Sequence, residues 1–265
     1  MSHSTFNTAV IKIGTEVVTT PDGALNERMI AHLVRQVRRV KEKIERVILV
    51  TSGAVASGRA KYQRKKHSGE RTTEKQMYAT GGQVRLMSLY EQYVEQQKDC
   101  IAHQLLVTRD NFSSGERQEQ ILGVLGEIFA DEIDGLPIFN ENDGIANEEI
   151  RFTDNDELAG MITSLVRSDV FVLLSDVDGV MKDYGTDHAS LIARIAPEQQ
   201  DAYRKYIVPV TSKKGTGGME SKYKVACNAA NNGMQAHIAN GRTPGILEKI
   251  LLDREKGVST MFSTR

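Results

Sequence analysis

The chain has 265 residues, of which 40% are hydrophobic and 26% are charged, so it can bury a full core without a disulfide or a structural metal. Its 34 basic and 35 acidic residues give a net charge of −1, which offers no electrostatic basis for nucleic acid or an anionic membrane as the main partner. We therefore expect a globular protein that acts on a small molecule.

Short β-branched runs alternate along the chain with longer segments of helical periodicity. The predicted strands are 9–13, 46–51, 101–108, 136–139, 170–175 and 236–239, and the predicted helices are roughly 25–44, 74–97, 116–133, 156–167 and 221–232. Alternating strands and helices indicate an α/β fold with a mostly parallel sheet that is covered on both faces. We expect a single domain over residues 1–265.

Several predicted strands end in small or polar residues. Gly14 follows the first strand, Ser52 the second and Asn140 the fourth, and Ser175 ends the fifth. In an open α/β sheet the ligand binds at the carboxyl ends of the strands, so this edge is the expected site.

The first motif is VIKIGT, residues 10–15, in which Lys12 lies inside a hydrophobic strand. A buried ammonium is costly unless it reaches an anion or solvent at the strand end. Lys12 could therefore point at a phosphate, with Gly14 letting backbone N–H groups approach it. A lysine on an edge strand is the alternative.

Two further motifs combine glycine with a polar turn. In VILVTSGAVASGR, residues 47–59, an apolar strand runs into a turn that presents Ser52 and then into a helix. In GTGGMESKYKVA, residues 215–226, a glycine-rich loop opens a helix that carries Lys222. The spacing excludes both the P-loop and the dinucleotide-binding motif, yet Lys12 and Lys222 both suit a phosphate.

Carboxylates and amides gather in NENDGIANEEIRFTDND, residues 140–156, with Arg151 as the one basic residue among them. A solvated loop and the first turn of a helix are two ordinary explanations. The stretch nevertheless connects a strand to a helix, which is where α/β proteins carry their chemistry. Another strand, in VFVLLSDVDGVM, ends in Ser175 and Asp176, which could hold a nucleotide or form a turn.

Taken together, these segments resemble the amino acid kinase family, and within it the branch that phosphorylates the side-chain carboxylate of free glutamate. The resemblance is carried by VIKIGT, VTSGAVASGR, KQMYATGGQVRLMSLYEQ, LLVTRDNF, NENDGIANEEIRFTDND, LLSDVDGVM, GTGGMESK and IANGRTPGI. Branches that act on N-acetylglutamate, aspartate, carbamate or uridylate do not combine NEND, DND and GTGGM in this order. The resemblance implies a three-layer αβα sandwich.

The resemblance also implies a reaction: transfer of the γ-phosphate of ATP, with Mg²⁺, to L-glutamate, giving γ-glutamyl phosphate in the first step of proline biosynthesis. A carboxylate is already an anionic nucleophile at neutral pH, so no general base is needed. The obstacle is bringing two anions together, which calls for lysines, backbone N–H groups and Mg²⁺.

Residue roles follow from the same resemblance. Lys12 and Lys222 are expected to contact the phosphates, and Asp156 to hold the two ammonium groups. Ser52, Asp143 and Asn155 are expected to bind glutamate, with the Asp143 carboxylate pairing with the α-ammonium. The residues expected on the nucleotide side are Lys12, Gly14, Ser175, Asp176, Gly215, Thr216, Gly217, Gly218, Met219 and Lys222. The residues that bind metal are not identified, and Glu148, Glu149 and Glu157 are expected to be solvated or to cap a helix.

Two residues depart from the family pattern. Glu16 and Glu220 stand where a small residue is usual, and an anion at Glu16 would oppose ATP binding unless its side chain turns away. They are the grounds for one alternative, a catalytically silent glutamate or proline sensor. The other alternative is a kinase of the same fold that acts on a different small carboxylate.

The remaining expectations concern the cell and the assembly. Cys100 and Cys227 lie far apart without metal-type spacing, so we expect buried or half-buried thiols. The pattern of a signal peptide is absent, which favours the cytoplasm. The resemblance implies feedback inhibition by proline and a homodimer or homotetramer. Many relatives append an RNA-binding type of domain called PUA, and we expect none here.

Overall fold

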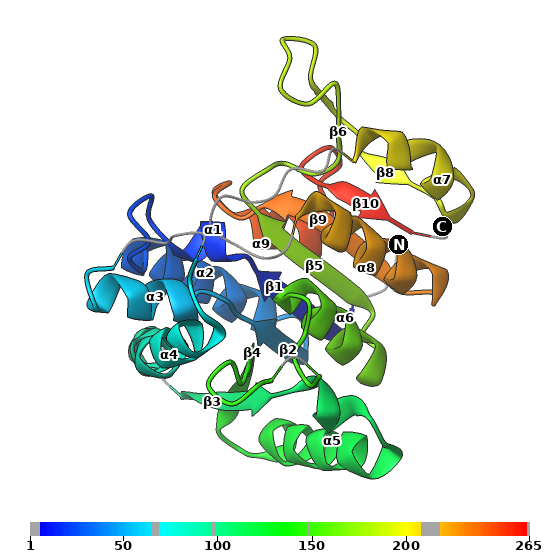
Figure 1. Ribbon diagram of the computed structural model, residues 1–265. Helices are drawn as coiled ribbons and strands as arrows, with labels where there is room; N and C mark the ends of the chain where they lie inside the picture. The colour runs from blue at the N-terminus through cyan, green and yellow to red at the C-terminus, as the bar shows by residue number, and fades with distance from the viewer. Residues whose placement is uncertain (1–5, 65–68, 97–98, 148, 208–217, 264–265) are drawn as a thin grey trace.

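The computed structural model describes residues 6–64, 69–96, 99–147, 149–207 and 218–263, which form a central sheet with helices on both faces (Figure 1). The strand order is β3-β4-β2-β1-β5-β9-β10-β8. These strands are β1 Thr8–Ile13, β2 Arg46–Val50, β3 Cys100–Val107, β4 Asp134–Glu141, β5 Val170–Ser175, β8 Arg194–Ile195, β9 Gln235–Asn240 and β10 Thr260–Phe262. Neighbouring strands are parallel except for β9 and β10. The predicted mostly parallel αβα sandwich is confirmed.

Helices connect the strands and cover the sheet. They are α1 Thr15–Val18, α2 Glu27–Lys41, α3 Ala54–Lys61, α4 Thr72–Glu95, α5 Gly115–Ala130, α6 Asn155–Leu165, α7 Gln200–Tyr203, α8 Met219–Asn231 and α9 Ile246–Leu251. Short 3₁₀ turns occur at η1 Arg109–Phe112, η2 Pro197–Gln199 and η3 Arg204–Tyr206, and a small hairpin pairs β6 Met181–Lys182 with β7 Ser190–Leu191. Every predicted strand and helix is present, with ends that shift by up to a few residues.

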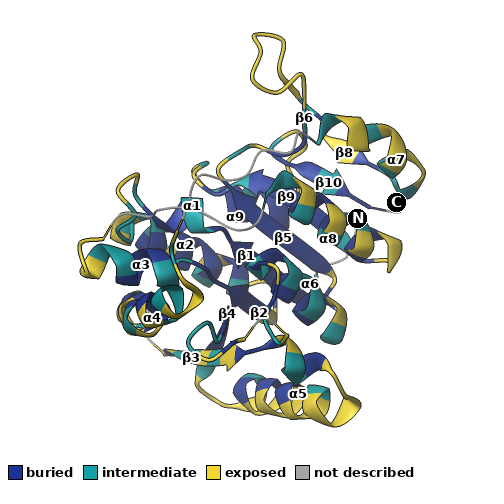
Figure 2. Cartoon of the chain, in the orientation of Figure 1, coloured by how far each residue is buried: buried dark blue, intermediate teal, exposed yellow. Residues whose placement is uncertain are grey.

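Side chains along each strand point alternately to the two faces of the sheet, so the core has two layers. In β1, Ile11 packs with α2, α4 and α9 on one face of the sheet, whereas Val10 packs with α5, α6 and α8 on the other. Both residues are fully buried, and Figure 2 shows the central strands as the most deeply buried part of the molecule. Each central strand is therefore apolar on both faces, which is why the sequence shows continuous apolar runs there.

The strand order places the polar strand ends side by side. β1 lies between β2 and β5, and β4 follows β2. Because these strands are parallel, the segments that leave their carboxyl ends meet at one edge of the sheet. The edge-strand alternative for Lys12 is wrong, since β1 is a central strand and Lys12 is only 5% exposed.

Helices α3 and α4 approach each other through glycine. A Cβ atom at Gly58 would lie 1.8 Å from the backbone oxygen of Tyr78, and one at Gly82 would lie 1.9 Å from the backbone oxygen of Ala54. No side chain can be accommodated at such distances without moving a helix. The two glycines thus set the distance between the helices that border the pocket described below.

This close packing leads to a prediction about stability. We expect Gly58→Ala to lower the free energy of unfolding by about 1–3 kcal/mol, because α3 and α4 must separate to admit the methyl group. Gly126→Ala is the matched control: Gly126 lies in α5 and an added Cβ atom would meet open space, so the higher helix propensity of alanine should stabilise the protein by up to about 1 kcal/mol. Urea denaturation measures both, and equal effects of the two substitutions would contradict this description of the α3–α4 contact.

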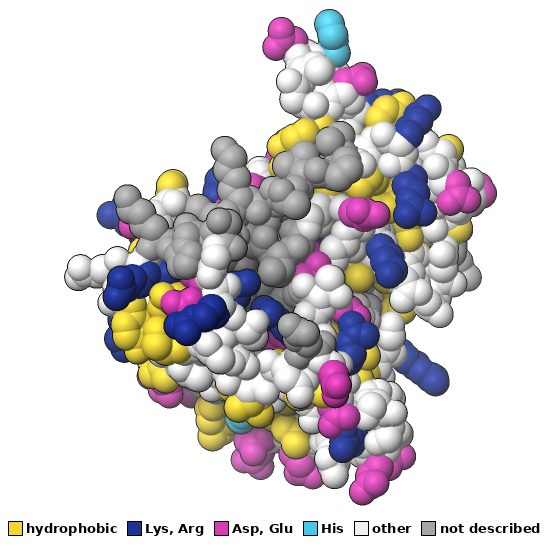
Figure 3. All heavy atoms as spheres, in the orientation of Figure 1, with side chains coloured by type: hydrophobic (Ala, Val, Ile, Leu, Met, Phe, Trp, Pro, Cys, Tyr) yellow, Lys and Arg dark blue, Asp and Glu magenta, His cyan; other side chains and the backbone are white. Residues whose placement is uncertain are grey.

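The distribution of surface charge and the burial of the two cysteines agree with what the sequence predicts. Acidic and basic side chains are interspersed over the face shown in Figure 3. Cys100 is buried and Cys227 half-buried, as predicted, and both thiols are free. None of the helices formed by the described residues combines the length and hydrophobicity needed to span a membrane.

Candidate active site

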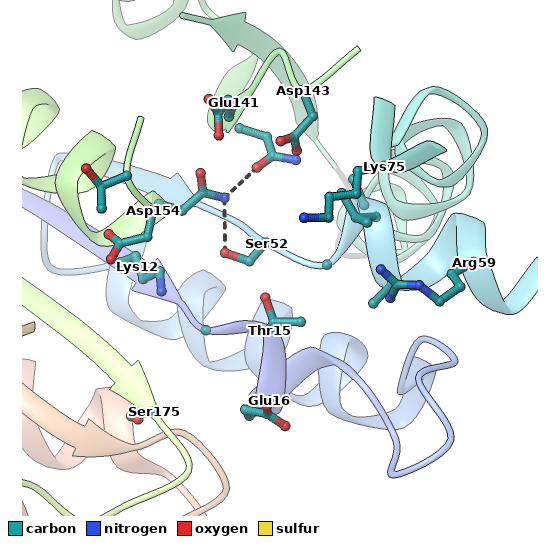
Figure 4. Close-up of a pocket in the computed structure, with 18 of the residues that line it drawn as sticks. Lys12, Thr15, Glu16, Ser52, Arg59, Lys75, Glu141, Asp143, Asp154 and Ser175 are labelled. Carbon is teal, nitrogen blue, oxygen red and sulfur yellow. Dashed lines mark hydrogen bonds between the residues drawn. The ribbon is translucent and has the colours of Figure 1, made fainter. Parts of the chain in front are cut away.

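A cleft opens at the carboxyl edge of the sheet, where the segments after β1, β2, β4 and β5 meet α3, α4 and α8 (Figure 4). Predicted site residues that line it are Lys12, Gly14, Ser52, Asp143, Asn155, Ser175, Asp176 and Lys222. Other lining residues are Thr15, Glu16, Gly53, Ala54, Val55, Ala56, Arg59, Glu70, Lys75, Asn140, Glu141, Arg151, Thr153 and Asp154. One pocket therefore gathers polar side chains from segments that are distant in the sequence.

Two lysines meet on one buried carboxylate beneath the cleft. Lys12 Nζ lies 2.6 Å from Asp156 Oδ1, and Lys222 Nζ lies 2.8 Å from Asp156 Oδ2. Asp156 is fully buried, and the two lysines are 5% and 6% exposed. The three side chains carry a net charge of +1, with both ammonium groups at the floor of the cleft. This excess of positive charge suits an anionic group in the pocket.

Burial and charge pairing act together on these groups. Burial lowers the pKa of Lys12 below its ordinary value, the Asp156 carboxylate opposes that change, and the nearby Lys222 ammonium adds to it. Burial alone would raise the pKa of Asp156, but the two ammonium groups outweigh it and hold that pKa below its usual range. Asp156 therefore stays ionised at neutral pH and keeps two like charges close together.

Three successive residues at the start of α6 have different tasks. Asp154 is the N-cap, and its Oδ1 accepts hydrogen bonds from the backbone N–H groups of Asp156 and Glu157 at 2.9 and 3.0 Å. The end of the acidic stretch does form the first turn of a helix, which was one of the ordinary explanations for it. Asn155 turns toward the β2 and β4 ends, whereas Asp156 turns toward the lysines. The helix N-terminus thus fixes two site groups at once.

A network of amides connects these segments at the carboxyl edge. Asn155 Nδ2 lies 2.8 Å from Asn140 Oδ1 and 3.1 Å from Ser52 Oγ, and Asn140 Nδ2 donates to Gln83 Oε1 at 2.7 Å. Ser52 is followed by Gly53, whose φ of +103° is the left-handed conformation that favours glycine. The network joins β2, β4, α4 and α6, so it holds Ser52 and Asn155 in place.

Two carboxylates share the wall formed after β4. Burial and the adjacent Asp143 raise the pKa of Glu141 to about 7, although the Phe152 backbone N–H donates to Glu141 Oε1 at 2.9 Å. Burial also raises the pKa of Asp143, opposed by Arg151, whose guanidinium lies 3.9 Å away. Together the two carboxyl groups hold a proton more readily than an isolated carboxyl group does. A cation bound between Glu141 and Asp143, in addition to Arg151, would favour loss of that proton.

The adjoining wall carries basic residues from α3 and α4. Arg59 makes two hydrogen bonds to Glu70, from Nε at 2.8 Å and from Nη2 at 2.7 Å, and its guanidinium stacks near the Tyr78 ring. Lys75, in the first turns of α4, extends into the cleft in Figure 4. The cleft therefore has an acidic wall and a basic wall at the end away from Ser175.

Only some of the residues predicted to contact the nucleotide lie within the described residues. The Gly14 N–H donates to the Leu174 carbonyl at 3.0 Å, so it is not available to a phosphate. Ser175 Oγ lies 3.3 Å from Asp176 Oδ1. Gly218 and Met219 begin α8 without lining the cleft, and the predicted residues Gly215, Thr216 and Gly217 lie outside the described residues.

The two residues that depart from the family pattern have different positions. Glu220 is exposed on α8, with Arg204 at 3.8 Å, and does not line the cleft. Glu16 does line the cleft, but its carboxylate points away from Lys12 in Figure 4 and its backbone oxygen accepts a hydrogen bond from Arg242. Neither anion lies against the lysine pair.

The other acidic residues of the 140–156 region are peripheral. Glu157, in the first turn of α6, accepts a hydrogen bond from the Thr153 backbone N–H at 2.9 Å and pairs with Arg109. Glu149 is exposed, and Glu148 lies outside the described residues. For Glu149 and Glu157 the predicted solvated or helix-terminal positions are confirmed.

The site prediction left out several side chains of the cleft that affect charge or position, among them Arg59, Lys75, Asn140 and Glu141. Each lies in a motif that was singled out, since Arg59 ends SGAVASGR and Lys75 begins KQMYATGG. The motifs thus contain these residues, but nothing in the motifs distinguishes them from solvated polar residues. Their partners, by contrast, depend on how α3 and α4 pack.

Comparison with known proteins gives consistent results. The model of the amino acid kinase family matches residues 7–240. Glutamate 5-kinase of Clostridium acetobutylicum is 35% identical over 260 residues, covering 98% of this chain and 95% of that protein. Glutamate 5-kinase of Caldanaerobacter subterraneus subsp. tengcongensis is 34% identical over 251 residues, covering 94% of this chain and 66% of that protein. The chain thus spans about two thirds of the length of some curated relatives and nearly all of others.

A solved structure shows the same fold. The crystal structure of UMP kinase from Bacillus anthracis aligns with a TM-score of 0.65 over 98% of this chain and 97% of that one, at 14% identity. At this identity the likeness concerns the arrangement of strands and helices alone.

Proposed function

This chain belongs to the amino acid kinase family, and on that basis we propose that it transfers the γ-phosphoryl group of ATP to the side-chain carboxylate of L-glutamate. The observation that carries the proposal is the pair of buried lysines, Lys12 and Lys222, held on Asp156 beneath a cleft with acidic and amide walls. Relatives that match nearly the whole chain are named glutamate 5-kinase, which supports the same reaction.

The proposed mechanism needs charge stabilisation rather than a base. The substrate carboxylate attacks the γ-phosphorus, the bond from that phosphorus to the bridging oxygen breaks, and ADP leaves with the electron pair. Charge accumulates on the phosphoryl oxygens and on the leaving oxygen. Lys12 and Lys222 are already ordered by Asp156, so they stabilise that charge without rearranging.

We propose that the acidic wall selects the amino acid. The α-ammonium of L-glutamate pairs with Asp143, while Ser52 and Asn155 hydrogen-bond to the remaining polar atoms. The amide network that holds Asn155 on Asn140 makes these contacts available before substrate arrives. An N-acetylated substrate lacks the cation and would leave the carboxylates unpaired, which disfavours it.

On the nucleotide side we propose that Ser175 and Asp176 face ATP, together with the 215–219 segment. Among the described residues no three His, Cys, Asp or Glu side chains come together as a metal-ligand cluster. Mg²⁺ commonly keeps several waters and takes oxygens from substrate phosphates, so we propose that it enters as Mg·ATP. Bound there, Mg²⁺ would neutralise phosphate charge.

A pH dependence follows from the carboxylate pair. The pKa of Glu141 is raised to about 7, so below this pH the pair keeps a proton that ammonium binding must displace. We expect the KM for L-glutamate to be about tenfold higher at pH 6 than at pH 8, with a smaller change in kcat. Initial rates across this range measure the effect, and Glu141→Gln should flatten it. An equal slope in that variant would assign the titration to another group.

Removing the charge of Asp143 tests its proposed contact. We expect Asp143→Asn to raise the KM for L-glutamate by about 10–100-fold, because the α-ammonium loses a charge-assisted hydrogen bond, with little change in kcat. Asp253→Asn, at an exposed position after α9, is the matched control and should behave as the unchanged protein. A normal KM in the Asp143 variant would remove this residue from the ammonium site.

The proposed reaction is tested by an acceptor panel. ADP release from Mg·ATP is measured with L-glutamate, N-acetyl-L-glutamate, L-aspartate and UMP as separate acceptors. The expected result is release with L-glutamate alone. Preference for another acceptor would favour a kinase of the same fold with a different substrate, and binding of ATP without any release would favour a sensor. The structure does not strengthen the sensor alternative, because Glu16 and Glu220 do not contact the lysine pair.

We further propose that proline competes with L-glutamate, because it offers the same ammonium and α-carboxylate to the pocket. Assembly as a homodimer or homotetramer is part of the same proposal, since the family resemblance implies it. The expected cytoplasmic location stays a prediction.

A further inference from the structure

The substrate proposed above has a third charged group to which no cationic residue has yet been assigned. L-Glutamate carries an α-carboxylate in addition to its α-ammonium and its reacting side-chain carboxylate. With the side-chain carboxylate near Lys12 and Lys222, and the ammonium near Asp143, the α-carboxylate would lie beside an acidic wall. It needs a cation there to avoid repulsion from Asp143 and Glu141.

The described residues place five cationic side chains around the cleft: Lys12, Arg59, Lys75, Arg151 and Lys222. Most of them are committed to carboxylates of the protein. The two buried lysines share Asp156, and Arg59 forms a two-point contact with Glu70, whose side chain is only 2% exposed. Arg151 lies 3.9 Å from Asp143.

Lys75 differs from the other four. Within the described ranges its ammonium has neither a hydrogen bond nor an ion pair, yet the side chain is half-buried and lines the cleft. In Figure 4 it points from α4 into the space that Ser52 and Asp143 also border. An uncompensated ammonium directed into a pocket is a ready partner for a ligand anion.

The backbone around Lys75 is fixed relative to the loop that carries Asp143. Gln76 Nε2 donates to the Ala146 carbonyl at 3.0 Å, which ties α4 to the segment after β4. A Cβ atom at Gly144 would lie 2.8 Å from Thr80 Cγ2, so the loop backbone rests directly on α4. Lys75 and Asp143 therefore belong to elements in contact, and their spacing is set by packing.

We propose that Lys75 binds the α-carboxylate of the amino acid substrate, so that Lys75 and Asp143 together recognise the zwitterion of a free α-amino acid. This inference rests on the proposed function, and it names a specificity-determining residue for that reaction. It explains why the pocket needs both a basic and an acidic wall. A substrate analogue that lacks either α-group would lose one of the two contacts.

Two competitive inhibitors separate the two contacts. Glutarate keeps both carboxylates of glutamate and lacks the ammonium, whereas 4-aminobutyrate keeps the ammonium and lacks the α-carboxylate. Their inhibition constants against L-glutamate are measured for Lys75→Met, for Asp143→Asn, and for Lys61→Met as an exposed lysine control at the end of α3. Methionine keeps the length of the lysine side chain and removes its charge.

We expect Lys75→Met to weaken glutarate inhibition by about tenfold or more and to leave 4-aminobutyrate inhibition within about twofold. Asp143→Asn should show the reverse pattern, and Lys61→Met neither change. Equal weakening of both inhibitors by Lys75→Met would overturn the proposal, because a general disturbance of the pocket does not distinguish the inhibitors. Unchanged glutarate inhibition would overturn it as well.

Calorimetric titration of the protein with L-glutamate measures binding without turnover, so it tests the Lys75 contact independently of the proposed reaction. If the unchanged protein binds L-glutamate without turnover, the kinase proposal fails, and weaker binding to Lys75→Met still supports the carboxylate contact. If turnover occurs and Lys75→Met binds L-glutamate normally, the contact is wrong while the reaction stands. If L-glutamate does not bind at all, both proposals are overturned.

Discussion

Replacing Lys222 with methionine is expected to lower kcat by about 10²–10³-fold, the loss typical of removing one preorganised charge donor from a transition state. The KM for L-glutamate should change by less than about threefold, because the contact strengthens as charge develops on the phosphoryl group. Lys222 is 6% exposed and lies 2.8 Å from Asp156, so its position does not depend on substrate. Steady-state kinetics with saturating Mg·ATP measure both constants.

Lys224 provides the matched control for this substitution. It lies on the same helix, α8, and is exposed, so Lys224→Met should leave kcat and KM unchanged. A large increase in the KM of Lys222→Met with normal kcat would show that Lys222 binds the ground state and the transition state equally. That result would remove it from the proposed catalytic role.

Replacing Asp156 with asparagine is expected to affect folding and catalysis together. Asp156 is fully buried between two ammonium groups, so its loss leaves two like charges without a partner. We expect the free energy of unfolding to fall by about 3–5 kcal/mol, as for other buried pairs broken on one side. The kcat should also fall, because the lysines separate or lose protons. Chemical denaturation and steady-state kinetics measure the two effects.

A second substitution separates the two effects. In Asp156→Asn combined with Lys12→Met, one of the two unpaired charges is removed, so much of the lost stability should return. Activity should not return, since one of the two proposed phosphate contacts is gone. If stability does not recover, the destabilisation of Asp156→Asn comes from a cause other than unpaired charge.

The layered fold was predictable because its signals are local. Central parallel strands bury both faces, so β1, β2 and β5 appear in the sequence as largely apolar runs, with Lys12 as the exception inside β1. The long helices show the period of one buried face. The elements that were not predicted are short: β8 has two residues and β10 has three, which is too little for any periodicity. Their pairing depends on tertiary contacts, including the antiparallel contact of β10 with β9.

The centre of the site was predictable for a chemical reason. A lysine in an apolar strand and another after a glycine-rich loop both need an anion, and the structure brings them to one carboxylate. Glu141 shows the limit of this reasoning. The predicted strand ended at residue 139, whereas β4 continues to Glu141 by pairing with Val107, and that extension buries the carboxylate. Register between strands is set by the fold and is not encoded in a local motif.

The basic wall was missed for a similar reason. Arg59 and Lys75 are polar residues in helices, and such residues are usually solvated. Only the close approach of α3 and α4 through Gly58 and Gly82 turns them toward the same cleft. The ion pair between Arg59 and Glu70 depends on the same packing.

Trapping the product tests the proposed reaction most directly. The protein is incubated with Mg·ATP, L-glutamate and hydroxylamine, which converts an acyl phosphate to a hydroxamate, and both γ-glutamyl hydroxamate and ADP are measured. The expected result is equal amounts of the two, with no hydroxamate from N-acetyl-L-glutamate and about 10²–10³-fold slower formation by Lys222→Met at the same protein concentration. Release of ADP without hydroxamate, or no ADP at all, would contradict transfer of the phosphoryl group to the side-chain carboxylate of glutamate.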